Sequence, residues 1–499
     1  MKTKNLILSA FALIVTATAC DKDPVVPPVV KPEEEQIIFS GNQIGSGIQE
    51  FEITKSNTIK KGTYLLKGWV YVTSGATLTI EPGTIIKGDK DTKAALIIER
   101  GAKIIAQGTK DLPIVFTSAQ PAGSRKPGDW GGLIVCGKAS NNKNEMIIEG
   151  GPRSKHGGSD DADNSGVLSY VRIEFAGYPF KADQEINGLT LGSVGSGTKI
   201  DHIQVSYSND DSFEWFGGTV NAKYLISYHG WDDDFDTDSG FRGNIQFGLI
   251  VRNPKIADKS ISNGFESDNN SDAPNQLPIT RPVFSNITLI GATGQDPQFL
   301  NTTAYIDGGV YNPNNGSKLG QHQASIQIRR GSNLHVYNSV ISGFPVGLMI
   351  CNDKGSQTQS AASDGRIGFK NNIIAQAGIL GSDKDASFKD SLSTNSSTFD
   401  KSAAESFSSS FFKLAANKNQ IFSSQIQLGL KQPVSILGNP NWGPVAGSPL
   451  TGKSGLFSET LLASTFFDKV DFIGAFRIDS QADNWSAGWA NFNPQQTSY

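Results

Sequence analysis

Acidic side chains gather between residues 209 and 238 of the 499-residue chain, in the stretch NDDSFEWFGGTVNAKYLISYHGWDDDFDTD. This stretch carries eight carboxylates against a single cation, Lys223, although the whole chain nets only −4. A phenylalanine followed by an acid recurs within the stretch and once after it, in the units Phe213-Glu214, Phe235-Asp236 and Phe265-Glu266. The recurrence predicts that a repeated structural unit holds three acids in one column.

Such a column favours a bound cation, because carboxylates held together repel one another unless a positive charge lies between them. Ca²⁺ fits this expectation, since it takes about six to eight oxygen ligands from carboxylates, amides and carbonyls. The sequence contains no EF-hand spacing, so the prediction depends on the column and not on a motif. The acids expected to hold Ca²⁺ are Asp211, Glu214, Asp234, Asp236, Asp238, Glu266 and Asp268.

Side chains beside these acids are expected to contact an organic ligand. Aromatic rings offer flat apolar faces on which sugar rings stack, and polar neighbours fix the orientation of the sugar. The predicted ligand contacts are Asp210, Trp215, His229, Trp231 and Arg242. Rings near the C-terminus leave two interpretations open, a cap on the last coil or a sugar-stacking platform, and these rings are Trp442, Trp485, Trp489 and Phe492.

The acids lie among short strands that recur over roughly residues 65–380. Apolar and polar residues alternate with a period of two in runs such as IQVSYS (203–208), YLISYHG (224–230) and ITLIGA (287–292), as half-buried strands require. Cleanly spaced turns of roughly 21–24 residues match one coil of a β-helix, and stacked coils bury an inner face that a single coil cannot. The chain is therefore predicted to be all-β, a parallel β-helix solenoid with a cap over residues 37–64.

Several longer segments resemble known proteins. EPGTIIKG (81–88), GDWGGLIVCGKA (128–139), DDSFEWFGGTVNAKYL (210–225) and GAFRIDSQADNWSAGWANFNP (474–494) look like signature blocks of a family of Bacteroidota surface lipoproteins. The solenoid itself resembles the right-handed parallel β-helix of the pectate-lyase-like superfamily. That resemblance implies a right-handed solenoid.

The start of the chain predicts export. Residues 1–19 place two lysines before an apolar run, as a signal peptide does, and Ala17-Thr18-Ala19-Cys20 resembles a lipobox, which implies that Cys20 is lipidated. Residues 20–36 are rich in proline and acid and are expected to form an extended tether. The β-helix and its cap follow over 37–383, and a C-terminal helical insertion and capping segment over 384–499. Near-helical spacing in that segment is shown by Phe399, Ala403, Phe407, Phe411 and Leu414.

These features predict an outer-membrane protein that faces the cell exterior, touches the membrane through its lipid anchor and supports an outer-membrane uptake complex. Cys136 and Cys351 are expected to be free and buried, because several coils separate them and a disulfide spans only about 7 Å between Cα atoms. Nucleic acid is excluded as a partner, since the sequence pI is about 5.8 and no basic stripe is present.

Two classes of function fit the acidic coils. We favour a non-catalytic module that binds an extracellular glycan. The alternative, implied by the resemblance, is a Ca²⁺-dependent polysaccharide lyase or glycoside hydrolase acting on an acidic polysaccharide. A hydrolase needs two carboxylates, for which Asp211 with Asp233 or Asp234 are candidates. A lyase needs a base, and the candidates are Lys223, His229, Arg242 and Arg252.

Overall fold

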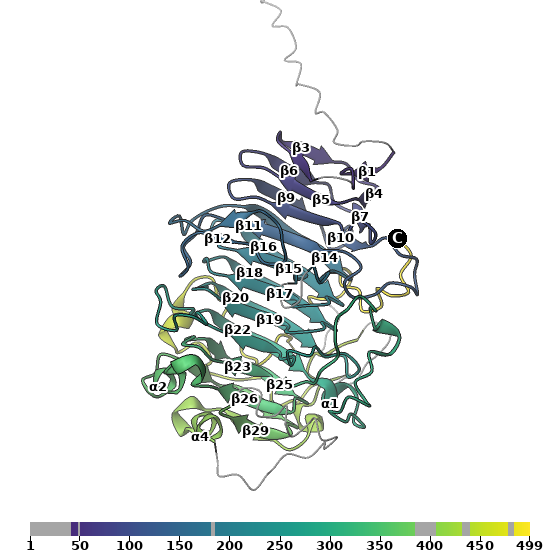
Figure 1. Cartoon of the computed structure of the whole chain (residues 1–499). Coiled ribbons are helices and arrows are strands. Elements are labelled where there is room, and N and C mark those ends of the chain that lie inside the picture. The colour runs from purple at the N-terminus through teal and green to yellow at the C-terminus, as the bar shows by residue number, and fades with distance from the viewer. Residues whose placement is uncertain (1–40, 48–49, 181–184, 385–405, 432–439, 478–483) are drawn as a thin grey trace, which may run out of the picture. The chain divides into compact units, whose positions relative to one another are not determined.

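Figure 1 shows the computed structural model of the chain, in which residues 41–47, 50–180, 185–384, 406–431, 440–477 and 484–499 are described. The predicted signal peptide, the lipidation site Cys20 and the tether lie outside the described residues, as do Phe399 and Ala403. Among the described helices, none is long and apolar enough to cross a membrane.

Parallel strands stacked coil on coil form two sheets (Figure 1). The eleven-stranded sheet consists of β2 (Phe51–Ile53), β5 (Trp69–Val72), β8 (Ala95–Ile98), β11 (Gly132–Cys136), β15 (Leu189–Gly192), β17 (Phe213–Phe216), β19 (Phe235–Asp238), β21 (Phe265–Ser267), β23 (Ile326–Ile328), β26 (Val346–Ile350) and β29 (Ile379–Ser382). Each of these strands pairs in parallel with the strand one coil away. The prediction of an all-β, right-handed parallel β-helix is confirmed.

The seventeen-stranded sheet wraps the other sides of the coils. Its strands are β1 (Gln43–Ile44), β3 (Asn57–Ile59), β4 (Thr63–Leu66), β6 (Thr77–Ile80), β7 (Ile85–Gly88), β9 (Lys103–Gln107), β10 (Ile114–Ser118), β14 (Gly166–Glu174), β16 (Lys199–Ser206), β18 (Asn221–Tyr228), β20 (Asn244–Val251), β22 (Val283–Ile290), β24 (His335–Tyr337), β25 (Val340–Ser342), β27 (Gly368–Lys370), β28 (Ile373–Ala375) and β30 (Gln420–Phe422). Their inward side chains and those of the other sheet share one continuous apolar core.

Alternation along each strand decides which residues enter that core. In β17 and β19, Phe213 and Phe235 point inward, pair in register and pack edge to face with ring centroids 5.4 Å apart. Phe265 of β21 continues the row, with its centroid 5.2 Å from that of Phe235. All three rings are fully buried. Because successive side chains of a strand point to opposite faces, the acids that follow these rings point outward.

The long strands of the seventeen-stranded sheet bend sharply at one residue in the left-handed region of backbone space. These residues are Tyr170 (φ 50°), His202 (φ 52°), Tyr224 (φ 60°), Phe247 (φ 62°) and Asn286 (φ 60°). A residue other than glycine costs roughly 1–2 kcal/mol in this conformation. Ring stacking between coils offsets that cost, since the centroids of Tyr170 and His202 lie 4.2 Å apart and those of His202 and Tyr224 lie 4.4 Å apart.

Both ends of the solenoid differ from the prediction. The segment expected to cap the N-terminal end contains β1 to β3, which pair in parallel with β4, β5 and β6 of the next coil and therefore form a first coil. At the other end β30 pairs with β28, so the sheet continues past residue 383. Strands can pair through their backbone groups with little side-chain periodicity. The alternation of apolar and polar residues therefore did not identify these short strands.

Helices are short and lie in loops. They are α1 (Ala292–Gln295), α2 (Thr358–Ser363) and α4 (Phe407–Lys413), with 3₁₀ turns η1 (Gly309–Tyr311), η2 (Asp353–Gly355), η3 (Ala415–Asn417), η4 (Gln425–Leu428) and η5 (Thr460–Ala463), and β12 (Met146–Ile147) pairs with β13 (Lys155–His156) in an antiparallel hairpin. The helical prediction is confirmed for Phe407 and Phe411, while Leu414 is the C-terminal cap of α4.

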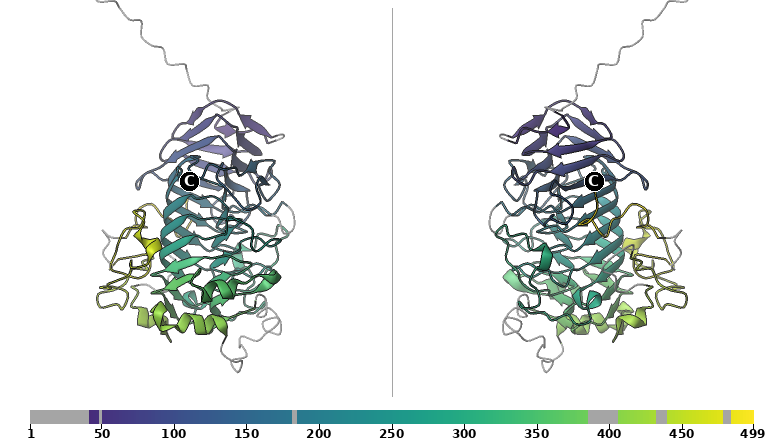
Figure 2. Two further views of the ribbon diagram at one scale, coloured as in Figure 1. Left: turned by 90° about the vertical axis from the view of Figure 1, so that its left-hand side faces the viewer. Right: turned by 90° about the vertical axis from the view of Figure 1, so that its right-hand side faces the viewer.

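The C-terminal segment runs along the outside of the seventeen-stranded sheet (Figure 2). Trp442, Trp489 and Phe492 are buried there against strand side chains of that sheet. Trp485 is partly buried and stacks on Phe476 with centroids 5.1 Å apart. Three of the four rings therefore pack against the solenoid wall and do not form an open sugar platform. Cys136 and Cys351 are free and buried, as predicted.

Candidate functional site

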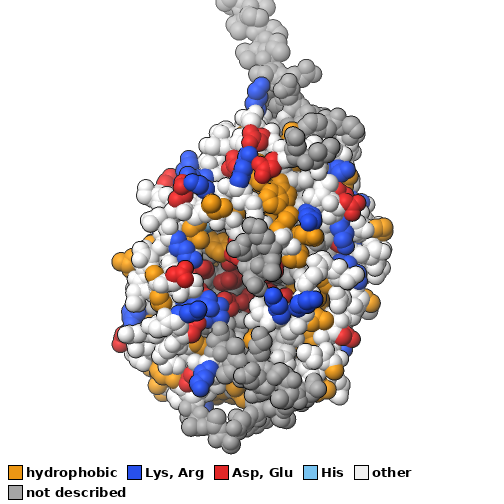
Figure 3. Space-filling view, in the orientation of Figure 1, with side chains coloured by type: hydrophobic (Ala, Val, Ile, Leu, Met, Phe, Trp, Pro, Cys, Tyr) orange, Lys and Arg blue, Asp and Glu red, His pale blue; other side chains and the backbone are white. Residues whose placement is uncertain are grey.

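The predicted acidic column exists on the outer face of the eleven-stranded sheet. Glu214 of β17 pairs in register with Asp236 of β19, and Asp236 pairs with Glu266 of β21. Thr190 and Gln327 continue the row on either side. Figure 3 shows a hollow near the middle of this face, with Asp and Glu atoms on its visible floor and Lys or Arg side chains on both sides of it.

The hollow is a pocket of about 550 Å³ in which twelve carboxylates and three cations line the wall. The cations are Lys259, Arg329 and Arg330. The carboxylates are Glu149, Glu185, Asp210, Asp211, Glu214, Asp232, Asp233, Asp236, Asp238, Asp258, Glu266 and Asp268. Such an excess of one sign within one cavity is electrostatically unfavourable unless protons or a cation compensate it.

Two groups of carboxylates lie close enough to share a metal ion, and Asp211 belongs to both. In the first group Asp211 meets Glu214 and Asp236, and in the second it meets Asp210 and Asp232, with ligand oxygens all within 4.8 Å of one another. Asp211 is held in place because one of its oxygens accepts the backbone N–H of Asp233 at 2.9 Å. The site is thus built around one anchored aspartate.

Two oxygens in these groups lack protein donors. Among the described residues, no hydrogen-bond partner reaches Oδ1 of Asp232 or Oδ1 of Asp236, although both atoms are shielded from solvent. A carboxylate oxygen buried without a donor is costly. A hard divalent cation such as Ca²⁺ bonds such oxygens, so the residues present fit a calcium ion.

Burial and mutual repulsion both make several carboxylates of the pocket harder to ionise. Burial is the larger cause and neighbouring carboxylates the next, and together they raise the pKa of Asp211, Glu214 and Asp236 well above the ordinary range. For Asp238, burial raises the pKa to about 6, and Asp268 adds to the rise while Lys143 opposes it. A cation bound among these groups would therefore displace protons near neutral pH.

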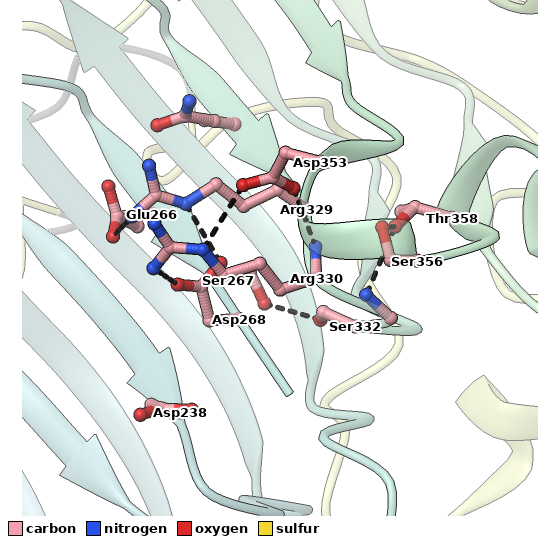
Figure 4. A network of polar contacts seen from close by, with 12 residues as sticks. Asp238, Glu266, Ser267, Asp268, Arg329, Arg330, Ser332, Asp353, Ser356 and Thr358 are labelled. Carbon is pink, nitrogen blue, oxygen red and sulfur yellow. Dashed lines mark hydrogen bonds and ion pairs between the residues drawn. The ribbon is translucent and has the colours of Figure 1, made fainter. Parts of the chain in front are cut away.

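One end of the pocket is neutralised by arginines (Figure 4). Arg329 donates to Glu266 and, through Nε, to Oδ1 of Asp268 at 2.9 Å. Arg330 donates from Nη1 to Oδ2 of Asp268 at 2.6 Å and from Nε to Asp353 at 3.1 Å. Glu266 and Asp268 were predicted metal ligands; both line the pocket, and guanidinium groups compensate their charges.

Asp234, another predicted metal ligand, lies outside both carboxylate groups and outside the pocket. Its side chain is fully buried and forms an ion pair with the equally buried Arg252, with Nη1 and Oδ2 3.2 Å apart. Ser227 donates to its other oxygen at 2.5 Å. Asp234 does not line the pocket, and the pair instead fastens neighbouring coils, since Arg252 also donates to the backbone oxygen of Trp231 at 3.3 Å.

Of the residues predicted to contact an organic ligand, some line the pocket and others do not. Asp210 lines the pocket. His229 is buried, stacks on Tyr228 at 3.7 Å and bonds the hydroxyl of Tyr207, so it does not reach the pocket. Arg242 lies outside the pocket and is engaged by Ser140 and Asp161. The cations that do line the pocket are not those predicted as bases.

Both tryptophans predicted to stack on sugar are buried. Trp215 lies inside the solenoid with no exposed surface and stacks on Phe241 with centroids 5.4 Å apart. Strict alternation explains this, because Glu214 points outward and the next residue must point inward. Trp231 is likewise fully buried, and its indole N–H donates to Asp258 at 3.0 Å. Its role is to orient a carboxylate of the pocket wall.

Sequence reasoning missed the residues that loops bring to the pocket. Glu149 follows the β12 strand, and Glu185 and Asp258 lie in connections between strands. No periodic pattern places such residues, so no sequence signal could have found them. Arg329 differs, because it directly follows β23 and the in-register pair Ser267 and Ile328 places it beside Asp268. Extending the strand alignment by one residue would have revealed that pair.

Comparison with known protein families supports the same fold. A family model described as a pectate-lyase-like beta helix domain matches residues 51–412. The crystal structure of pectate lyase Pel9A is 14% identical in sequence, with 82% of this chain and 89% of that chain covered and a TM-score of 0.36. Among curated proteins, no sequence matches. Since the family model spans well over half of the chain, the protein belongs to the family of pectate-lyase-like β-helix domains.

Proposed function

We propose that the protein is a cation-dependent binding module for an acidic glycan, with the acidic pocket as its site. The observation that carries this proposal is the pair of carboxylate groups that share Asp211 and leave oxygens of Asp232 and Asp236 without described donors. Ca²⁺ held by these acids supplies positive charge to which a sugar carboxylate binds. Arg329, Arg330 and Lys259 at the same pocket add donors for further sugar oxygens.

A binding role is favoured over catalysis because both arginines of the pocket already bond carboxylates. Arg329 and Arg330 each bond two carboxylates, which holds their protons in place. A lyase that uses Lys259 is the second candidate, since this lysine lines the same pocket as the acids. Unsaturated sugar products in an absorbance assay with Ca²⁺ and polygalacturonate would establish the lyase, and their appearance in wild type but not in a Lys259→Gln variant would assign the base.

The binding proposal is tested by calorimetric titration with oligogalacturonate in Ca²⁺ and in EDTA. We expect heat of binding in Ca²⁺ that EDTA diminishes, and loss of this Ca²⁺-dependent part in a Glu214→Gln, Asp236→Asn double variant. An Asp364→Asn variant is the matched control, because Asp364 is largely exposed and lies outside the pocket. A Ca²⁺-dependent component that survives the double variant would place the cation elsewhere.

We also propose that the protein is lipidated on Cys20 and displayed on the outside of the outer membrane, beside an uptake complex. Support for this proposal comes from the sequence of residues 1–36. Metabolic labelling with a fatty acid should mark the wild-type chain and not a Cys20→Ser variant. Protease added to intact cells should remove the wild-type protein, and full protection would contradict an outward orientation.

A further inference from the structure

A second cavity lies on a different part of the solenoid, at the bend of the seventeen-stranded sheet. It has a volume of about 810 Å³ and is lined by ends of β9, β14, β16 and β18 and by Phe466 of the C-terminal segment. This corner groove shares no residue with the acidic pocket. Its volume falls within the range of about 300–1,000 Å³ that is typical of small-ligand sites.

The corner groove offers hydrogen-bond donors and positive charge. Three lysines line it, Lys110, Lys199 and Lys223. Asp468 pairs with Lys223 at 2.7 Å, and the single carboxylate in the lining itself is that of Asp201. That carboxylate is already engaged, because it accepts from Ser169 at 2.6 Å and from His202 Nδ1 at 2.8 Å, with Lys199 at 3.2 Å. The groove therefore presents an excess of donors to any ligand that enters.

Two phenol groups add to these donors. Tyr170 and Tyr224 line the groove, and each carries a hydroxyl that can donate a hydrogen bond. Burial is the main cause that raises the pKa of both phenols, and Asp201 and Asp468 respectively are the next cause. Both hydroxyls thus remain protonated and able to donate at neutral pH.

The groove is rigid before any ligand binds. His202 is stacked between Tyr170 and Tyr224, at 4.2 and 4.4 Å, and Trp489 braces Tyr170 and His202 edge-on at 5.8 and 5.7 Å. Neighbouring rings cover the faces of Tyr170, His202 and Tyr224. The edges of these rings, which carry partial positive charge, are therefore the parts that can face a ligand. A preformed site loses less entropy on binding.

We propose that the corner groove binds a segment of an anionic oligosaccharide directly, without a metal ion, as a second site separate from the acidic pocket. The lysines and phenols contact carboxylate or sulfate oxygens of the sugar. Lys199 is an accessible contact, with 60% of its side chain exposed, while Lys223 lies deeper and pairs with Asp468 at 2.7 Å.

The experiment is a calorimetric titration of the full-length protein in EDTA, which silences the acidic pocket. The probes are hexagalacturonate, its fully methyl-esterified form and a sulfated hexasaccharide of equal length. We expect the anionic probes to bind and the ester to bind at least tenfold more weakly, since esterification removes the negative charge and adds only one methyl group at each carboxyl. Binding by one anionic probe alone would identify carboxylate or sulfate as the preferred group.

A Lys110→Gln, Lys199→Gln variant should weaken binding in EDTA by about tenfold or more, as loss of charge-assisted bonds implies. Tyr170→Phe and Tyr224→Phe keep the ring ladder and should each weaken binding several-fold. Lys354→Gln is the matched control, because this exposed lysine lies outside the corner groove. Asp236→Asn should leave EDTA-resistant binding unchanged, which separates failure of this proposal from failure of the proposed calcium site.

Three results would overturn the proposal. The first is absence of binding by both anionic probes in EDTA. The second is binding that the lysine variant retains in full. The third is equal binding of the methyl ester, which would show that charge is irrelevant. A single-stranded oligonucleotide that binds as tightly as the sugars would replace the glycan with a general polyanion.

Discussion

The substitution Asp236→Asn tests the acidic pocket most directly, because its effect on stability should change sign with Ca²⁺. Asp236 lies in register between Glu214 and Glu266 and belongs to the carboxylate group centred on Asp211. Without a cation its charge repels the charges of Asp211 and Glu214. With a cation the same side chain becomes a ligand. The substitution therefore removes a repulsion in one condition and a bond in the other.

The size of the repulsion follows from the spacing. The ligand oxygens lie within 4.8 Å of one another, and two unit charges at that separation repel by about 3.5 kcal/mol at an effective dielectric constant of about 20. Partial protonation relieves some of this repulsion, because burial and neighbouring acids raise the pKa of Asp236. We therefore expect Asp236→Asn to stabilise the protein by about 1–2 kcal/mol at pH 8 in EDTA, a rise in Tm of a few degrees.

Calcium should reverse the order of stability of wild type and Asp236→Asn. A ligand at about 100 times its Kd stabilises a protein by about 2.7 kcal/mol, so wild type should gain several degrees in Tm. Asp236→Asn loses a charged ligand and should gain much less, leaving it below wild type. Thermal unfolding in EDTA and in Ca²⁺ measures both effects, with Asp364→Asn as an exposed control that should follow wild type in each.

Two outcomes would refute the reasoning. If wild type melted at the same temperature in EDTA and in Ca²⁺, the pocket would not bind calcium. If Asp236→Asn gained as much from Ca²⁺ as wild type, the ion would bind at other residues. Mg²⁺ at equal concentration distinguishes a calcium site from general screening, because Mg²⁺ keeps its waters and needs a stricter geometry.

Three further outcomes follow from the same structure. Burial raises the pKa of Asp238 to about 6 in the folded protein. The protonated side chain therefore contributes its full stability below the unfolded pKa near 4, and this contribution is lost as pH rises through about 6. Without Ca²⁺, Tm should fall from pH 5 to pH 7, and a flat profile would contradict the shift. Arg252→Met strands the buried carboxylate of Asp234 and should cost about 3–5 kcal/mol in urea unfolding, most of it recovered by Arg252→Met with Asp234→Leu. Trp215→Phe should lower stability by about 1–3 kcal/mol through a core cavity and leave the affinity for oligogalacturonate unchanged, whereas a weakened affinity in the folded variant would return Trp215 to the site.

The sequence by itself determined the solenoid and the acidic column. Alternation with a period of two fixes which residues enter the core, and phenylalanines 22 and 30 residues apart, Phe213, Phe235 and Phe265, mark successive coils. These two features are sufficient to predict that Glu214, Asp236 and Glu266 stack on successive coils. The same alternation also assigns Trp215 to the core. The prediction that Trp215 contacts a ligand was wrong because it relied on the aromatic side chain and not on the position of the residue in the strand.

Only the tertiary structure decided which of the acids keep an uncompensated charge. Strand alignment brings Asp268 beside Arg329, but only the folded structure shows that the two side chains meet at 2.9 Å and that Arg330 bonds the same carboxylate. Glu149 and Asp258 enter the pocket from loops whose course no periodic pattern specifies. Charges act through space over a few ångströms, whatever their separation in sequence. The acids could therefore be identified from the sequence, but the balance of charge around them depended on the fold.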